Sequence, residues 1–458
     1  MGGQGRVLTA VLWFGVASAL MPLGAAVGQS DSQNDFEELE ERINLSDSPG
    51  VSDEHDMAVS GNDVYVVYRD VNPPTFEGEI KLRKSEDRGQ HFGDPESISD
   101  TDRPVSEPHI AVQTERVYIV WLETQSGPLE TTILFRRSEN GAESFDDPVT
   151  IDVEGAIVTN LKIAADGCDV YVAWSQSPSV RFSASHNCGR SFDEPTVLSN
   201  QQIGITQMIA RGTNVFIIGD NEASDPTPEV FFIRSTNEGR SFESIVNLSQ
   251  SSGEASLNPR MAVEGNKVYV VWEKCDDLDE TNVCDVLFRR STNNGDSFGP
   301  RVTLSDSEGL ARAPDVAAEG VRVYVAWQDN SPGNFDIFLQ VSFDEGQRFR
   351  RDPQNLSETP ESSVAVRISA EKQFLRVAWV EATPGLLGLP EIFYRASDDS
   401  GKSSSFGPVL NLSETPEGAS ILPLVLTSID GKNGYVSWVD VDDQGNSDVF
   451  FRSTEVKD

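Results

Sequence analysis

One short pattern recurs along almost the whole chain, and it constrains the fold more than any other feature. It reads serine, any residue, aspartate or asparagine, any residue, glycine, two further residues and phenylalanine. Close copies occupy residues 85–92, 185–192, 235–242, 291–298 and 342–349. Looser copies occupy 138–145 and 397–406, and an eighth copy begins at Ser453. Successive copies are about 50 residues apart, which is the period of a repeat architecture rather than of independent domains.

The residue types in this pattern are those of a tight turn between two strands. The aspartate or asparagine side chain accepts hydrogen bonds from turn amides, and glycine adopts a positive φ without steric cost. The phenylalanine is expected to fold back over the turn. The acidic or amide position is occupied by Asp87, Asn140, Asn187, Asn237, Asn293, Asp344 and Asp399.

Each repeat also contains four short stretches with the alternation typical of β-strands. In the fifth repeat they are residues 259–263, 268–272, 286–291 and 301–304, which we call strands a, b, c and d. Strand b can be recognised eight times, and six of the seven tryptophans end it. Eight four-stranded repeats predict an all-β fold, a β-propeller with eight blades; seven blades is the alternative.

The two ends of the repeat region complement one another. The last repeat stops after Ser453 and has no strand d. Residues 43–46, Ile-Asn-Leu-Ser, match the strand-d ends at 247–249, 355–357 and 411–413. We therefore expect the N-terminal segment to supply the outer strand of the last blade, which would remove the open edge of the ring.

The residues before the repeats have the features of an export signal. Residues 1–28 contain Arg6, an apolar run at 7–20 and small residues before Gln29, as in a cleavable signal peptide. An uncleaved anchor is the alternative, although the run is short for a membrane span. Residues 29–42 are polar and acidic and are expected to be flexible. Residues 43–458 are predicted to form one propeller domain of a secreted or cell-surface monomer with no membrane span after cleavage.

The repeated turn resembles the Asp-box, or BNR repeat, of the sialidase superfamily. The resemblance covers Ile43 to the end of the chain and implies a propeller. Enzymes of that family hold a carboxylate with three arginines and attack with a tyrosine activated by glutamate. This chain lacks their Phe/Tyr-Arg-Ile-Pro motif, and its eight repeats exceed their six blades. Only Tyr68 and Tyr394 lie outside the strand-b position, and both fall in predicted strands.

These departures favour a non-catalytic binding or scaffold module over an enzyme. Its ligand or partner would be an extracellular glycan, a protein or another polar molecule. A glycoside hydrolase of exo-sialidase type, acting at the channel mouth, is the alternative. The net charge of −38 argues against nucleic acid as a partner.

The four cysteines predict two disulfides. Cys275 and Cys284 flank the loop between strands b and c of one repeat. Cys168 lies in the a–b turn of another repeat and Cys188 in its c–d turn, and these turns share one end of an up-and-down blade. The topology therefore predicts the pairs 168–188 and 275–284, and with them an oxidising compartment.

Charged residues are expected at the end of the channel opposite the repeated turns. The start of strand a, which lines the channel, carries His109, Lys162, Arg260 and Arg367. Acidic residues stand two positions after the last aromatic residue of strand b: Asp70, Glu123, Asp329 and Glu381. One interpretation of these charges is a hydrated channel lining in which they neutralise each other. The other is a binding site for an anion or a sugar acid.

Two further motifs concern cations and glycosylation. Asp440, Asp442, Asp443 and Asp448 surround a glycine at a spacing that loosely resembles calcium loops, so that Ca²⁺ can be accommodated there. No other cofactor is expected to be required. Asn-Leu-Ser sequons recur with the repeat, which indicates a structural role first; they begin at Asn44, Asn247, Asn355 and Asn411.

Overall fold

The computed structural model describes residues 37–456 with short gaps. The residues outside it are 1–36, 73–76, 102, 125–130, 153–156, 222–224, 226, 252, 277–282, 306–307, 383–388, 416–417 and 457–458. The predicted signal peptide therefore lies outside the described residues, and so do the tips of several predicted b–c loops. No helix in the described part of the chain is long and apolar enough to cross a membrane.

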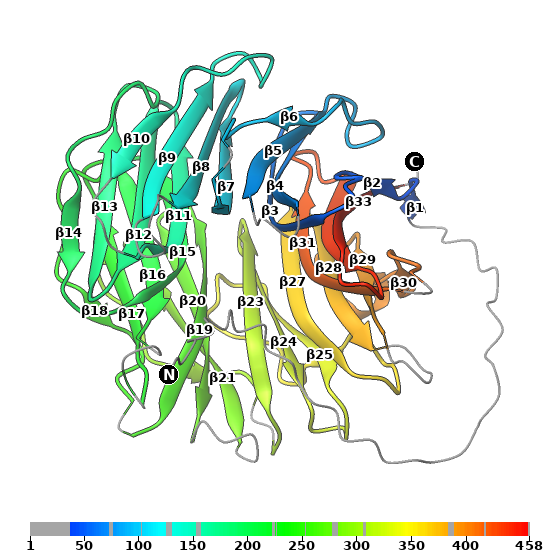
Figure 1. Cartoon of the computed structure of the whole chain (residues 1–458). Coiled ribbons are helices and arrows are strands. Elements are labelled where there is room, and N and C mark those ends of the chain that lie inside the picture. Colours follow the sequence, from blue (N-terminus) through cyan, green and yellow to red (C-terminus); the bar gives the residue numbers. More distant parts are fainter. Residues whose placement is uncertain are drawn as a thin grey trace, which may run out of the picture. The chain divides into compact units, whose positions relative to one another are not determined.

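The fold is all-β, with antiparallel four-stranded sheets that follow one another along the chain (Figure 1). The first of six separate sheets contains β7 (Val105–Gln113), β8 (Arg116–Thr124), β9 (Thr131–Ser138) and β10 (Val149–Asp152). The second contains β11 (Thr159–Asp166), β12 (Asp169–Gln176), β13 (Ser179–Ser185) and β14 (Thr196–Ser199). The third contains β15 (Gly204–Arg211), β16 (Asn214–Asp220), β17 (Val230–Ser235) and β18 (Val246–Asn247).

The same order continues in the next three sheets. The fourth contains β19 (Ala255–Glu264), β20 (Lys267–Cys275), β21 (Cys284–Ser291) and β22 (Val302–Thr303). The fifth contains β23 (Ala311–Glu319), β24 (Arg322–Asp329), β25 (Asp336–Ser342) and β26 (Gln354–Asn355). The sixth contains β27 (Ser363–Glu371), β28 (Phe374–Ala382), β29 (Pro390–Ser397) and β30 (Leu410–Asn411). A 3-10 turn, η1 (Ser403–Ser405), precedes β30.

The remaining strands form one nine-stranded sheet from both ends of the described chain. One part is β3 (Val51–Ser60), β4 (Asp63–Asn72), β5 (Glu77–Ser85) and β6 (Glu96–Ser97). The other is β31 (Ala419–Thr427), β32 (Asn433–Val441) and β33 (Ser447–Val456). The parts meet at a parallel pair, Val51 with Ser447. Two short N-terminal strands, β1 (Glu37–Leu39) and β2 (Ile43–Asn44), also pair with β33.

The N-terminal pairing agrees with the prediction in one part and differs in another. Ile43 pairs with Phe451 and Asn44 with Phe450, as the match to strand d predicts. Residues 37–39, which we expected to belong to a flexible segment, instead form β1 against residues 454–456. The physical reason is that the Glu37 side chain is buried and hydrogen-bonded to Arg376 and Tyr394.

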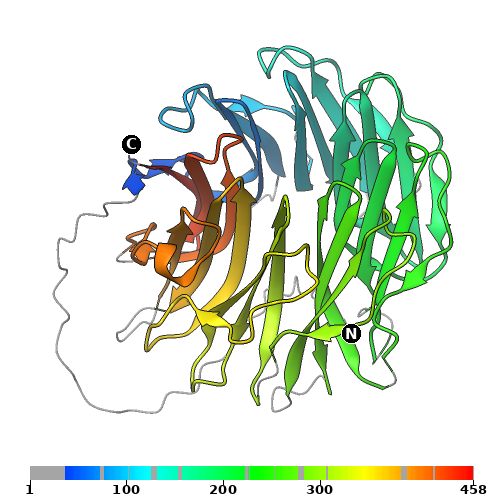
Figure 2. The same ribbon diagram turned by 180° about the vertical axis from the view of Figure 1, so that it is seen from behind.

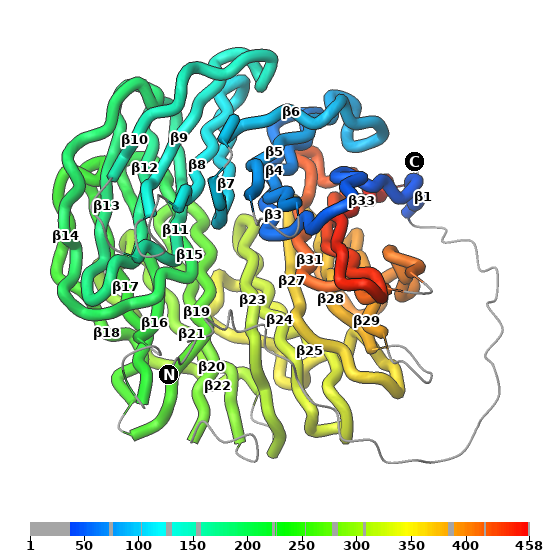
Figure 3. The backbone as a smooth tube through the Cα atoms, viewed as in Figure 1, coloured from blue at the N-terminus to red at the C-terminus, as the bar shows by residue number. Residues whose placement is uncertain are grey.

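Successive sheets pack face to face, and the first strand of each sheet lies on the inner side of the arrangement (Figures 2 and 3). We call these first strands, β3, β7, β11, β15, β19, β23, β27 and β31, the inner strands. Each inner strand contacts the inner strand of the next sheet, and β31 contacts β3. The second strands of the sheets are the most buried because they have a strand on either side and a sheet on each face. The six strand-b tryptophans are at most 1% exposed.

The repeated turns connect neighbouring sheets as well as strands. In the fourth-sheet copy, Ser291 Oγ accepts the Gly295 amide at 2.9 Å and donates to Asn293 Oδ1 at 2.7 Å. Gly295 has φ +77°, and a Cβ on it would lie 2.7 Å from the Phe232 ring of the preceding sheet. The turn phenylalanine, Phe298, packs edge-on against the same ring. Phe298 therefore covers its own turn and also packs the turn against the preceding sheet.

Both predicted disulfides are present. Cys168 is bonded to Cys188, and Cys275 to Cys284. The first joins the turn before β12 to the turn after β13. The second joins the facing ends of β20 and β21, where the two cysteines are cross-strand partners.

Candidate functional site

Every inner strand contains an irregularity in its pairing with the second strand of its sheet. The pairing with the second strand shifts within residues 53–56 of β3, and it shifts at the corresponding place in the other seven inner strands. A β-bulge of this kind redirects side chains and is frequent beside functional sites. The first residues paired after the bulge form one series, which we call the channel positions: Asp56, His109, Lys162, Gln207, Arg260, Asp315, Arg367 and Leu424.

Acidic or amide side chains of the preceding sheet hold the bulges in place. The bulge residue before each channel position has positive φ in seven inner strands, for example 49° at Glu107 and 48° at Ala313. Its amide is then free of the strand ladder. The Glu107 amide donates to Glu54 at 2.8 Å, and the Ala313 amide donates to Glu273 at 2.8 Å. Sequence analysis did not single out these two acids; in the sequence, Glu54 stands two residues before Asp56 and Glu273 stands directly after Trp272.

One side of the channel series carries a connected acid–base chain. Asp56 Oδ2 lies 3.2 Å from His109 Nδ1 and accepts the Ile110 amide at 3.2 Å. Burial alone would raise the pKa of Asp56, but the hydrogen bond and charge of His109, together with the amides of Ile110 and Met57, outweigh it, so the pKa is lowered. Lys162 Nζ lies 3.4 Å from His109 Nε2. Burial lowers the pKa of Lys162, and the charge of Arg260 adds to the effect.

The other side carries two arginines whose positive charges have few negatively charged partners. Arg367 Nη1 donates to the Val366 carbonyl at 2.9 Å. Its pKa is lowered to about 10, first by burial and then by Arg260, while Asp315 acts in the opposite direction. Asp315 already accepts the amides of Val316 and Ile368. Arg260 has no hydrogen-bond or ion-pair partner among the described residues.

The structure thus brings the four predicted basic residues to equivalent places on inner strands. His109, Lys162, Arg260 and Arg367 all stand at channel positions. Within this set, His109 and Lys162 are in contact, and Arg260 is near enough to both Lys162 and Arg367 to lower their pKa values. An arrangement of three cations on strands of a rigid sheet system can bind an anion.

The four predicted acids are not part of this arrangement. Asp70 accepts from Ser52 Oγ and Lys81 Nζ, and Glu381 accepts from Ser363 Oγ and Trp379 Nε1. Burial raises the pKa of Glu381. Glu123 is paired with Arg103, and Asp329 accepts the Ser331 amide. All four are less than 10% exposed. Their hydrogen bonds and ion pairs connect strand ends within their own sheets.

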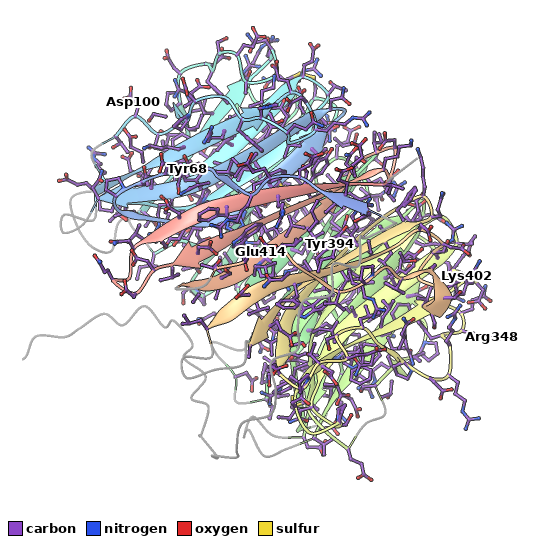
Figure 4. The ribbon with its side chains drawn as sticks, turned by 90° about the vertical axis from the view of Figure 1, so that its right-hand side faces the viewer. Tyr68, Asp100, Arg348, Tyr394, Lys402 and Glu414 are labelled. Carbon is purple, nitrogen blue, oxygen red and sulfur yellow. A yellow bond between two sulfur atoms is a disulfide. The ribbon has the colours of Figure 1, made fainter. Side chains whose placement is uncertain are left out.

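The two tyrosines outside the strand-b position are also internal. Tyr68 donates to the Leu45 carbonyl at 3.2 Å, and Tyr394 donates to Glu37 Oε2 at 2.7 Å. Both are fully buried, and Figure 4 shows them among the strands while Arg348 and Lys402 lie at the periphery. Neither hydroxyl is at a channel position.

Aspartates of the predicted calcium loop accept hydrogen bonds from other residues. Asp442 accepts the Gln444 and Asn446 amides inside its own turn. Asp440 accepts from Ser420 and Trp438, and Asp448 accepts from Asn44 and Ser46. In the described part of the chain these acids do not gather into a group of three metal ligands. Asp443 is exposed to solvent. The sequon asparagine Asn44 thus has the structural role that its recurrence indicates.

Comparisons with known proteins give remote structural likenesses only. No protein-family model matches the chain, and no curated protein matches it in sequence. Polysaccharide lyase Uly1 aligns over 81% of this chain and 91% of its own, with 10% identity and a TM-score of 0.48. Penicillium chrysogenum alpha-L-arabinanase aligns over 82% and 99%, with 12% identity and a TM-score of 0.45. Leech intramolecular trans-sialidase aligns over 92% and 94%, with 10% identity and a TM-score of 0.38. Similarity at this level carries no conclusion about activity.

Proposed function

We propose that the sheets form an eight-bladed propeller closed by the N-terminal strand. Six separate sheets and the two halves of the nine-stranded sheet make eight units. Eight apolar clusters fill the spaces between successive units, and one of them joins Leu45 and Met57 to Tyr435 and Phe451. The first repeated turn supports the same closure, since Phe92 packs edge-on against Phe451 of the last repeat. Its turn chemistry is that expected of an Asp-box.

On this scaffold, we propose that the protein is a secreted or cell-surface binding module for an anionic polar ligand of the acidic-glycan class. The observation that carries the proposal is Arg260. It is a half-buried cation without a partner among the described residues, in a protein of net charge −38. A buried cation is normally paired. Burial lowers the pKa values of Lys162 and Arg367, and the charge of Arg260 lowers both further. An anion between these three groups would relieve both the desolvation and the repulsion.

A carboxylate fits this site better than a neutral sugar. Guanidinium groups bind carboxylates through two parallel hydrogen bonds, and the ammonium of Lys162 adds a point charge. The acid–base chain Asp56–His109 lies at the edge of the cationic group and offers further polar contacts. Catalysis of the exo-sialidase type stays the alternative, but both candidate tyrosines are buried away from the channel positions.

The proposal is tested by calorimetric titration with uronic acid and sialic acid oligosaccharides, compared with neutral oligosaccharides of equal length. The double variant R260A/R367A should lose the acidic ligand while its melting temperature stays close to that of the wild type. The control R348A/K402A removes the same charge from exposed positions and should bind normally. Equal affinity for neutral and acidic oligosaccharides, or unchanged binding by R260A/R367A, would reject the site. Turnover of aryl-glycosides would establish the enzymatic alternative.

A further inference from the structure

A second group of polar residues lies away from the channel positions, between the sheet of β12 and the sheet of β17. Asp169 is the first residue of β12, His186 follows β13, and Glu238 lies in the repeated turn after β17. One ligand atom from each of the three lies within 4.8 Å of the others. All three residues are half-buried. Two carboxylates and one imidazole therefore converge from two sheets.

The disulfide Cys168–Cys188 holds the first two of these residues. Asp169 follows Cys168 directly, and His186 precedes Cys188 by two residues. His186 Nδ1 lies 2.7 Å from Asp169 Oδ1. The other ring nitrogen, Nε2, is buried and makes no hydrogen bond within the described ranges, and Asp193 Oδ2 lies 3.8 Å from it. The disulfide thus holds an oriented imidazole whose second nitrogen makes no hydrogen bond.

The same place in another interface shows what is unusual here. Lys267 is the first residue of β20, as Asp169 is the first residue of β12, and Glu345 has the position of Glu238 in its turn. Lys267 Nζ and Glu345 Oε1 form an ion pair at 3.1 Å. In the group described above, an aspartate replaces that lysine. Two carboxylates then face each other where the equivalent pair has opposite charges, and only Glu238 has an arginine partner, Arg240.

We propose that Asp169, His186 and Glu238 bind one divalent metal ion of the zinc class and that the ion joins the two sheets. Two carboxylate oxygens and an imidazole nitrogen are a ligand set that Zn²⁺ accepts, with water in the fourth position. The imidazole selects against Ca²⁺ and Mg²⁺, which prefer oxygen ligands only. The ion would supply the positive charge that Lys267 provides in the other interface. The disulfide would lower the cost of assembling the site.

The test uses the full chain with both disulfides intact and Zn²⁺ alone as the probe. Equilibrium dialysis should find one saturable Zn²⁺ site, and saturating Zn²⁺ should raise the melting temperature. H186Q and E238Q should each weaken binding by about tenfold or more. The matched control is H91Q, because His91 forms the same kind of pair with Asp87 at 2.7 Å in another copy of the turn but has no third ligand within the described residues.

The two test variants come from different sheets, so that a folding defect in one leaves the other readable. Each is first measured without metal, for melting temperature and for the absence of free thiols. Loss of the site in either folded variant, with H91Q normal, supports the proposal. It is overturned if the wild type shows no saturable Zn²⁺ binding, or if its binding is unchanged in H186Q and E238Q. Stronger binding of Ca²⁺ than of Zn²⁺ would overturn the assigned metal class.

Discussion

Arg376 Nη2 donates a hydrogen bond to Glu37 Oε1 over 2.9 Å, and the two side chains are 0% and 1% exposed. Arg376 occupies the strand-b position at which the other sheets have tyrosine or phenylalanine. Tyr394, from the neighbouring strand, also donates to Glu37. A buried arginine in one sheet is thus neutralised by a residue of the N-terminal segment, which makes that segment part of the fold.

Removing the Glu37 carboxylate should therefore be costly. E37A leaves a buried guanidinium without its counterion, and loss of one member of such a pair lowers the free energy of unfolding by about 3–5 kcal/mol. The measurement is unfolding in guanidinium chloride. The control is E38A, which changes the exposed neighbour on β1. Similar midpoints for E37A and E38A would show that the pair contributes little.

Deleting the N-terminal strands should destabilise the last repeat. The segment 37–49 supplies two strands to β33, the buried Leu45 side chain, and a carbonyl that accepts from Tyr68 and Arg83. A chain without residues 29–49 should melt at a markedly lower temperature and lose amide protection first in β33. A chain without residues 29–36 only should melt like the parent. Equal melting of the two deletions would contradict the proposed closure.

The sequence predicted the elements that depend on local spacing and missed those that depend on strand register or on a distant residue. The turn, strand b and the disulfides are set by local spacing, so that Cys168 could be placed opposite Cys188 from topology alone. The inner-strand bulges could not be located, because a shift of one residue moves every following side chain to the other face of a strand. Arg260 could therefore be named as a candidate but not shown to lack a partner. Glu37 was missed because its partner is 339 residues away.

The turn glycines should be required by both conformation and space. G295A places a Cβ at φ +77° and 2.7 Å from the Phe232 ring. The conformation costs about 1–2 kcal/mol and the steric overlap about 1–3 kcal/mol. The control is G265A, with φ +58° and open space around it, which bears the conformational cost alone. Thermal unfolding of both variants separates the two costs. Equal destabilisation would mean that the turn does not press against the preceding sheet.

Stability should fall as the pH is lowered from 7, because of His55. Burial lowers the pKa of His55 to about 4, against about 6.5 in an unfolded chain, and Asp56 and Asp53 only partly oppose the shift. The unfolded chain then binds the proton more readily than the folded one between these two values. Stability is therefore complete above about pH 6.5 and declines toward pH 4, by at most about 1.4 kcal/mol per pH unit from this group.

The measurement is the free energy of unfolding at a series of pH values between 7.5 and 4.5 in wild type, H55N and H91N. H55N should show a flatter decline than the wild type, since it removes the group whose protonation favours unfolding. H91N changes a histidine that is 87% exposed and should keep the wild-type slope. A wild-type slope in H55N, or a flattened slope in H91N, would assign the pH dependence to other groups. Carboxylates such as Asp56 have a lowered pKa in the folded protein. Their protonation, and the loss of stability that follows from it, therefore occurs below this pH window.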